Sequence, residues 1–265
     1  MDKELLRYYE DYYFSNSLPV PFRLKENNFT LNIKPITVNM FPFYRDNIGV
    51  LLINKNSIND ATIISMNYLQ YLVDVVLLDE NYQRALVTIF NLSFGEEYSY
   101  TIGHFVNTNK PYIGIHKDGK ILSRITAKEF DKIKDIIIFY NDRNYDDRYI
   151  SEDMRKAIED YNKIRFKDTY MPTLEERKAF VSFKSGLTQQ QINDMSYRYF
   201  DIMYDQCVSN DLFFSQKIIQ ASEKYKVNDD EIVYPLFKKK DNKFDFLRDA
   251  DQWEKKVSAA AQGGQ

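Results

Sequence analysis

Alternation of apolar and polar residues, the pattern of a half-buried strand, occurs in two stretches of the sequence and stops at Ile125. The first stretch, residues 29–33, ends before Pro35, because proline cannot continue a hydrogen-bonded strand. The second, residues 98–125, is interrupted by a polar Asn-Thr-Asn-Lys segment and by an Asp-Gly pair typical of a two-residue hairpin turn. This second stretch predicts three antiparallel strands, and the rest of the chain is expected to be mainly helical.

Apolar residues at helical spacing predict helices around these strands. Residues 3–14 predict a short amphipathic helix, and residues 37–54 predict another, in which Pro42 fits only in the first turn. Residues 60–78 are apolar nearly all round, which is typical of a central helix. Residues 126–129 form a capping box, so a further helix is expected to start there. Its buried face is expected to carry Phe130, Ile133, Ile137 and Tyr140.

Beyond residue 145 every pattern in the sequence is helical. Ser151 can cap a helix that extends through Arg165. Capping boxes at residues 173–176 and 188–191 predict two more helices, the first of which is ended by Gly186. The helix after residue 188 is expected to bury Ile192, Met195, Tyr199 and Met203, and a following helix is expected to bury Phe214, Ile218, Ala221 and Tyr225.

These patterns predict an α+β fold, with a helix-rich N-terminal half that holds a small antiparallel three-stranded sheet and an all-helical C-terminal half. The charged residues 141–148 have nothing to bury, and we interpret them as a connector. The predicted domains are an α+β domain at residues 1–145 and a helical domain at residues 146–265. A flexible tail is expected after about residue 258.

The charge balance disfavours nucleic acid as a partner. The 265 residues include 36 Lys and Arg against 39 Asp and Glu, so no strongly basic surface is expected. Residues 173–206 have the spacing of a helix-turn-helix, but the second helix carries only Arg198 as a basic residue, and two packed helices are the favoured interpretation. The charged N-terminus and the lack of an apolar run of about 18 residues predict a soluble protein without a membrane partner.

The two histidines are the first candidates for catalysis or metal binding. If the turn between the first two strands pairs Val106 with Pro111, His116 lies opposite Thr101. His104 and His116 then project from opposite faces of the sheet, so they cannot share a metal. We therefore expect them to be half-exposed structural residues.

No other residue pattern predicts an active site. Cys207, the single cysteine, lies in a helical pattern and is expected to be a small buried side chain. Adjacent carboxylates, such as Glu96 and Glu97, lie in polar segments, whereas a catalytic pair needs burial to separate its two pKa values. Phosphate-binding, dinucleotide-binding and hydrolase motifs are absent. The sequence therefore predicts no catalytic residue, no cofactor and no metal, and we interpret the protein as not an enzyme.

Four segments follow one another in an order that is found in a known family. Residues 29–43 read Phe-Thr-Leu-Asn-Ile-Lys-Pro-Ile-Thr-Val-Asn-Met-Phe-Pro-Phe, and residues 63–72 read Ile-Ile-Ser-Met-Asn-Tyr-Leu-Gln-Tyr-Leu. Residues 172–176 read Pro-Thr-Leu-Glu-Glu, and residues 185–200 begin with Ser-Gly-Leu-Thr-Gln-Gln-Gln. The chain thereby resembles tail assembly chaperones of bacteriophages that infect Gram-positive bacteria, and the related baseplate-hub assembly proteins.

The resemblance implies a non-catalytic tail assembly chaperone that binds phage tail proteins, such as the tape-measure protein or tube and baseplate components. It implies localisation in the host cell cytoplasm, and a homo-oligomer is compatible with it. The alternative is a structural virion protein of the tail, baseplate or neck, which would be found in the virion. A host-directed regulator or an enzyme of another kind is the third hypothesis.

The C-terminal segment carries the predicted partner-binding residues. Phe246, Ala250, Trp253 and Val257 recur at steps of four, three and four, which predicts a helix with a narrow apolar stripe. This helix either packs on the protein's own helical half or lies in a groove of a partner or of a second copy. In the second case the contact residues are Phe246, Leu247, Ala250 and Trp253.

Overall fold

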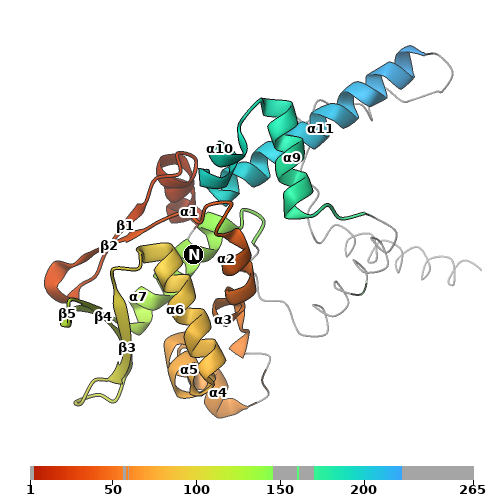
Figure 1. Cartoon of the computed structure of the whole chain (residues 1–265). Coiled ribbons are helices and arrows are strands. Elements are labelled where there is room, and N and C mark those ends of the chain that lie inside the picture. Colours follow the sequence, from red (N-terminus) through yellow and green to blue (C-terminus); the bar gives the residue numbers. More distant parts are fainter. Residues whose placement is uncertain (1–2, 56–57, 59, 146–159, 161–169, 223–265) are drawn as a thin grey trace, which may run out of the picture. The chain divides into compact units, whose positions relative to one another are not determined.

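Helices and two small antiparallel sheets make up the described part of the chain (Figure 1). The structure, a computed structural model of the 265-residue chain, describes residues 3–55, 58, 60–145, 160 and 170–222. The fold is α+β as predicted, and the described strands all lie before residue 126. The helices are α1 (Lys3–Tyr9), the π-helical η1 (Glu10–Phe14), the 3₁₀ turns η2 (Glu26–Asn28) and η4 (Val76–Leu78), α2 (Phe41–Asn47), α3 (Gly49–Leu52), α4 (Ala61–Ser65), α5 (Tyr68–Asp74), α6 (Glu80–Phe94), α7 (Ala127–Asn141), α9 (Leu174–Ser185), α10 (Gln189–Asp194) and α11 (Tyr197–Ala221).

The predicted three-stranded sheet is present, with its strands in the order β3 (Ser99–His104), β4 (Pro111–Lys117) and β5 (Lys120–Ile125). Asp118 and Gly119 join β4 to β5 with φ angles of 53° and 75°, the left-handed conformations that a two-residue hairpin needs. A second sheet pairs β1 (Val20–Arg23) with β2 (Thr30–Ile33). The sequence did not predict β1, because Pro21 lies within it.

The register of β3 against β4 differs from the predicted one by two residues. His116 lies opposite Ser99 rather than Thr101, because the connecting loop closes at a hydrogen bond from Phe105 N to Lys110 O of 2.9 Å. A shift by an even number of residues keeps each side chain on its own face of the sheet. The predicted consequence, that His104 and His116 face opposite sides, is therefore confirmed although the register was wrong.

The main core packs helices α5, α6 and α7 against both sheets. The predicted face of α7 is buried, and the predicted capping box of this helix is present. Helix α6, which no prediction assigned, buries Leu86, Ile89, Phe90 and Phe94, and Asp79 caps its first turn by accepting from Asn81 N at 2.8 Å. The spacing of these apolar residues and the cap were signals that could have predicted α6.

The single helix predicted for residues 60–78 is wrong, because the chain breaks at Met66. Met66 is extended, and Asn67 caps α5 by accepting from Gln70 N at 2.9 Å. Asparagine favours such a cap over a position inside a helix, since its side chain competes for backbone hydrogen bonds. The predicted helix 37–54 likewise begins later, at Phe41, and places Pro42 in its first turn as expected.

The helices after residue 170 keep their predicted starts but not all of their predicted lengths. The capping boxes of α9 and α10 are both present, and Gly186 ends α9 in the left-handed conformation. Helix α10 stops at Asp194, because Met195 O accepts from Val38 N at 3.0 Å and Tyr197 N donates to Ile36 O at 2.7 Å. Helix α11 then starts anew, so the two helices predicted around Met203 and Phe214 are one helix.

A second, smaller core lies where α9, α10 and the start of α11 meet the segment after β2. It buries Val38, Val181, Ile192 and Phe200, and the ring of Phe41 stacks on Tyr197. Packing divides the chain into two compact units, residues 1–204 and residues 205–265. The domain boundary predicted after residue 145, the helix from Ser151 and the tail after residue 258 fall outside the described residues and stay predictions.

Candidate functional site

The histidines occupy separate polar contacts of the sheet. His104 Nε2 lies 2.9 Å from Asp74 Oδ1 at the end of α5. His116 Nε2 lies 2.8 Å from Thr101 Oγ1 on the other face. Cys207 is half-buried in α11. The described residues contain no group of three His, Cys, Asp or Glu side chains that could hold a metal ion.

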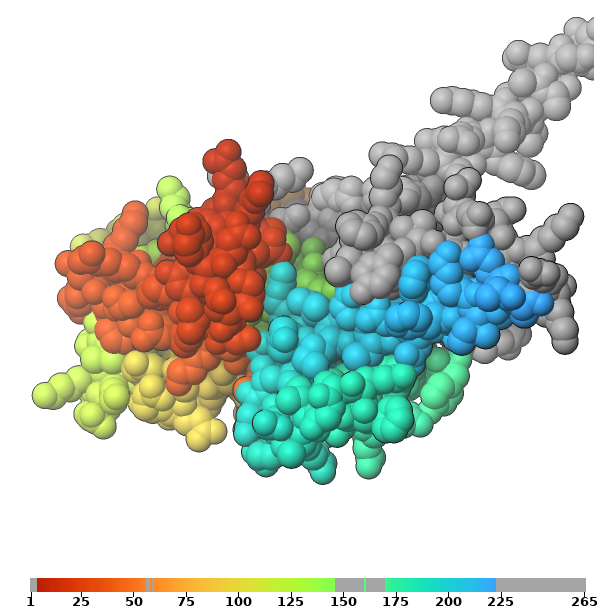
Figure 2. Space-filling view, turned by 90° about the horizontal axis from the view of Figure 1, so that it is seen from above, coloured from red at the N-terminus to blue at the C-terminus, as the bar shows by residue number. Residues whose placement is uncertain are grey.

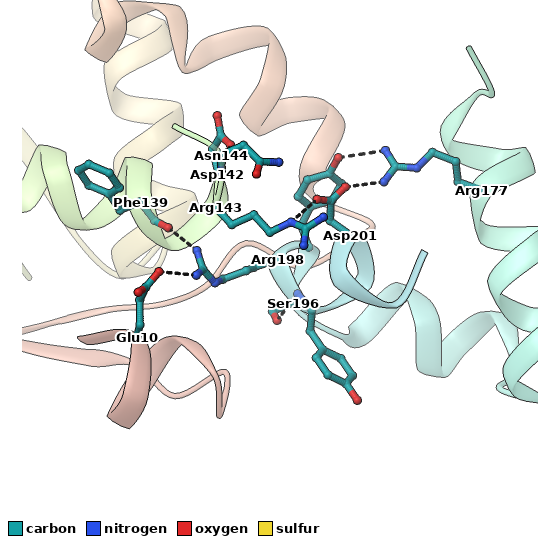
Figure 3. A network of polar contacts seen from close by, with 11 residues as sticks. Glu10, Phe139, Asp142, Arg143, Asn144, Arg177, Ser196, Arg198 and Asp201 are labelled. Atoms are coloured by element: carbon teal, nitrogen blue, oxygen red, sulfur yellow. Dashed lines mark hydrogen bonds and ion pairs between the residues drawn. The ribbon is translucent and has the colours of Figure 1, made fainter. Parts of the chain in front are cut away.

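The densest polar cluster is instead centred on Asp201 of α11 (Figure 3). Asp201 Oδ2 accepts from Arg143 Nε at 3.0 Å, and its Oδ1 accepts from Arg177 Nη2 at 2.6 Å. Arg177 also donates from Nη1 to the hydroxyl of Tyr197 at 3.2 Å, and its guanidinium lies over the ring of Tyr204. Helix α9, helix α11 and the segment after α7 are thereby joined by one carboxylate.

Arg198 forms the second half of this cluster, on the side of the N-terminus. Its Nη2 donates to Glu10 Oε1 at 2.8 Å, and its Nη1 donates to the carbonyl oxygen of Phe139 at 2.8 Å. Figure 2 shows the N-terminal residues (red) against the start of α11 (cyan), where Ser17 and Ser196 also share a hydrogen bond. We call the set of Glu10, Arg143, Arg177, Tyr197, Arg198 and Asp201 the arginine–aspartate network.

The arginine–aspartate network explains why the helix-turn-helix spacing does not present a basic surface. Arg198, the one basic residue of the candidate recognition helix, is only 11% exposed. Its donors are used by a carboxylate and by a helix-terminal carbonyl, so they do not point into solvent. Residues 173–206 form three helices, α9, α10 and the start of α11, so the favoured interpretation of two packed helices is wrong in the number of helices.

A hollow of about 340 Å³ lies beside the network, between α2, the end of α7 and the start of α11. Tyr44 and Tyr197 contribute rings to its lining. Burial raises the pKa of Tyr44, and the nearby Asp142 raises it further. Burial also raises the pKa of Tyr197, against the opposing effect of Arg177. Both tyrosines are therefore neutral hydrogen-bonding groups over the ordinary pH range.

The geometry of the network indicates a structural role. Both carboxylate oxygens of Asp201 and both terminal guanidinium nitrogens of Arg198 are used by elements far apart in the sequence. Sequence reasoning missed this cluster because its members are scattered from Glu10 to Asp201. The only local signal is that Arg198 and Asp201 interrupt an otherwise aromatic run at the start of α11.

The second unit is described from Asp205 to Ser222, the C-terminal part of α11. Its apolar side chains are largely exposed, with Phe214 59% and Ile218 71% accessible. Phe214 and Ile218 are four residues apart and therefore share a helix face. The prediction that this face is buried is wrong. Leu212 and Ile219, seven residues apart, lie on another face and are also exposed. We call these four residues the α11 apolar surface.

The predicted partner-binding residues Phe246, Leu247, Ala250 and Trp253 lie outside the described residues. None of the described helices combines the length and the apolar composition that crossing a membrane requires. Comparison of the chain with protein-family models, with curated proteins and with solved structures finds no match.

Proposed function

We propose that this protein is a non-catalytic phage tail assembly chaperone, which binds a tail component such as the tape-measure protein until the tail tube polymerises. Two features support the proposal: the resemblance of residues 29–72 and 172–200 to that family, and the α11 apolar surface. The observation that carries it is the α11 apolar surface, because a chaperone must offer apolar contacts that its client can later leave.

The chemistry of the α11 apolar surface suits a helical client segment. Between Asp205 and Ser222 the charged residues are Asp205, Asp211 and Lys217, so the helix is weakly charged as well as apolar. An amphipathic helix of a client can place residues at three- and four-residue spacing along Phe214 and Ile218. Phe214 and Ile218 adjoin on one helix face, and contiguous exposed apolar side chains of this kind are typical of protein-binding surfaces.

Coexpression with the tape-measure protein of the same phage tests this function. We expect the wild-type chain to keep the tape-measure protein soluble and to copurify with it. The double variant Phe214→Asp and Ile218→Asp should lose both effects, because charges replace the exposed apolar side chains. Phe183→Asp is the control, since Phe183 is 82% exposed on α9 and its replacement removes an exposed ring from the first unit.

The outcomes separate the proposal from its alternatives. Retention of client solubility by the double variant would contradict the role of the α11 apolar surface. A structural virion protein, the second candidate, is distinguished by mass spectrometry of purified particles, in which a chaperone should be absent and a tail subunit present in fixed ratio. A gene position away from the tape-measure gene would favour the third hypothesis, a host-directed protein.

A further inference from the structure

A hollow of about 320 Å³ lies between helix α6 and strand β3, which run side by side in Figure 1. The α6 residues that line the hollow lie on one face of the helix, and the sheet residues that line it come from β3 and β4. We call this hollow the β3 groove. Its lining includes Gln83, Val87, Phe90, Tyr100, Ile102 and Ile113.

The β3 groove is apolar and open to solvent. Val87 and Ile102 are each 42% exposed, although Ile102 lies opposite the buried Ile113. The hydroxyl group of Tyr100 is buried and has no hydrogen-bond partner in the described part of the chain. The groove thus leaves apolar surface for an external molecule to cover.

The backbone of β3 offers hydrogen bonds along the same groove. Strand β3 is at the end of the order β3–β4–β5, so only one of its sides is paired. In an antiparallel pair, successive residues of a strand direct their backbone groups alternately toward and away from the partner strand. Phe105 N donates to Lys110 O, so Phe105 is one of the residues whose backbone faces the partner side. Tyr100, Ile102 and His104 therefore direct their N–H and C=O groups away from β4. Among the described residues nothing bonds to these outward backbone groups.

The opposite edge of the sheet is covered, which makes the open edge at β3 more informative. At β5, Asn27 Nδ2 donates to Leu122 O at 2.9 Å, and Arg124 pairs with Glu26. The β4–β5 ladder also contains an irregularity, which discourages further pairing. Residues 99–104 read Ser-Tyr-Thr-Ile-Gly-His, with no lysine, proline or bulge against β4 to protect the edge.

We propose that the β3 groove binds an extended segment of another protein, which adds a fourth strand to the sheet beside β3. The backbone of the segment pairs with Tyr100, Ile102 and His104, and every second side chain enters the hollow lined by Val87 and Phe90. The segment therefore has β-branched or aromatic side chains at alternate positions. This inference does not rest on the partner being a tail component.

A second copy of this chain fits the groove less well than an extended segment does. A second β3 would bring its own α6 to the same edge, because α6 runs next to β3 (Figure 1), and the two helices would then meet at the groove that the alternate side chains have to enter. A segment without a flanking helix avoids this conflict.

Fluorescent eight-residue peptides, in which threonine alternates with valine, isoleucine, leucine or phenylalanine, test the proposal with the full-length protein. We expect at least one of these peptides to bind, as measured by fluorescence anisotropy. The same peptide with N-methyl groups on alternate backbone amides should bind at least tenfold more weakly, because it cannot donate along one edge. Binding should slow hydrogen exchange of the Ile102 and His104 amides at least tenfold, and leave the Thr101 amide, which faces β4, unchanged.

Two surface variants locate the binding. Val87→Glu should weaken peptide binding at least tenfold, because it places a charge in the groove at an exposed position. Ile64→Glu, which changes a side chain on α4 that is 47% exposed, is the matched control and should stay within twofold of wild type. Thermal unfolding of both variants checks that the fold is retained.

Three results would overturn the proposal. The first is that none of the peptides binds at 1 mM. The second is that the N-methylated peptide binds as well as its parent, which would mean simple apolar adsorption without strand addition. The third is a dimer, detected by analytical ultracentrifugation, that Val87→Glu dissociates, because the groove would then be occupied by a second copy.

Discussion

The arginine–aspartate network and the β3 groove contain similar groups, aromatic rings next to polar atoms at the margin of a core, and use them in opposite ways. In the network, Asp201 accepts from Arg177, which also donates to the Tyr197 hydroxyl, and Arg198 donates to the Glu10 carboxylate and to a backbone carbonyl, so that Arg177 Nε is its one buried donor without a partner among the described residues. In the β3 groove, the Tyr100 hydroxyl and the outer edge of β3 have no partners among the described residues. The internal partners of the network therefore indicate a structural role, whereas the open backbone edge of β3 leaves hydrogen-bonding groups for a binding partner.

Removal of the central carboxylate of the network should have the largest effect. We expect Asp201→Ala to lower the free energy of unfolding by about 3 kcal/mol, because two guanidinium groups that are 13% and 18% exposed lose their shared acceptor. This corresponds to a fall in Tm of roughly 6–12 °C for a domain of this size. Thermal and urea unfolding measure the change.

An exposed ion pair provides the control for this variant. Glu80 and Arg84 pair at 3.0 Å on α6, but their side chains are 80% and 73% exposed. Glu80→Ala should therefore cost about 0.5 kcal/mol or less. Equal losses for Asp201→Ala and Glu80→Ala would contradict a structural role for the network.

What the sequence could predict depended on how far apart the determining residues lie. The capping boxes of α7, α9 and α10 are set within four residues, and all three were predicted. The break at Met195 is caused by backbone pairing with residues 36–38, which no local pattern can reveal. Arg143 and Asp201 are 58 positions apart, so their contact has no sequence motif.

The β3 groove illustrates the same limit. The alternating residues of β3 were recognised as a strand, but alternation does not tell which strand lies at an open edge. The edge depends on Asn27 and Glu26, which cover β5 from a distant turn. The groove also needs α6, which was not predicted. The sequence thus predicted the strand, but the position of this strand at an open edge follows only from the tertiary arrangement.

The two regions should behave alike at alkaline pH, because each contains a buried tyrosine. Burial raises the pKa of Tyr44 beside the network and of Tyr100 in the β3 groove. In the unfolded chain a tyrosine has its ordinary pKa of about 10. Below pH 10 both states are neutral, and the contribution of the buried tyrosine to the free energy of unfolding is complete. Above pH 10 this contribution is lost progressively, because the tyrosine then ionises in the unfolded state only. Each such tyrosine should lower the free energy of unfolding by about 1.4 kcal/mol per pH unit above 10.

Urea unfolding between pH 8 and pH 11 measures this loss. Tyr44→Phe and Tyr100→Phe should each flatten the fall above pH 10. Tyr12→Phe is the control, since Tyr12 is 62% exposed, and its pH profile should match that of the wild type. A profile of Tyr44→Phe that is as steep as the wild-type profile would contradict the burial of Tyr44 in solution.

At neutral pH, removal of a tyrosine hydroxyl should affect stability differently according to whether that hydroxyl has a hydrogen-bond partner. Tyr140 donates to Leu18 O at 2.8 Å inside the core, so Tyr140→Phe should cost about 1 kcal/mol. Tyr100→Phe should leave stability unchanged or raise it slightly, because its buried hydroxyl has no described partner. A cost of 1 kcal/mol or more for Tyr100→Phe would mean that this hydroxyl has a partner, and the β3 groove would then resemble the network.

The smallest effects are expected from the histidines, which are the residues an enzymatic hypothesis would place first. His104 and Asp74 form a contact whose side chains are 37% and 32% exposed, and the contact of His116 with Thr101 is also at the surface. His104→Ala and His116→Ala should therefore each cost about 0.5 kcal/mol. Because neither contact shapes the α11 apolar surface, both variants should retain client solubilisation in the coexpression assay. Loss of that activity in a histidine variant with a wild-type Tm would show that a histidine takes part directly in function, and the non-catalytic interpretation would have to be abandoned.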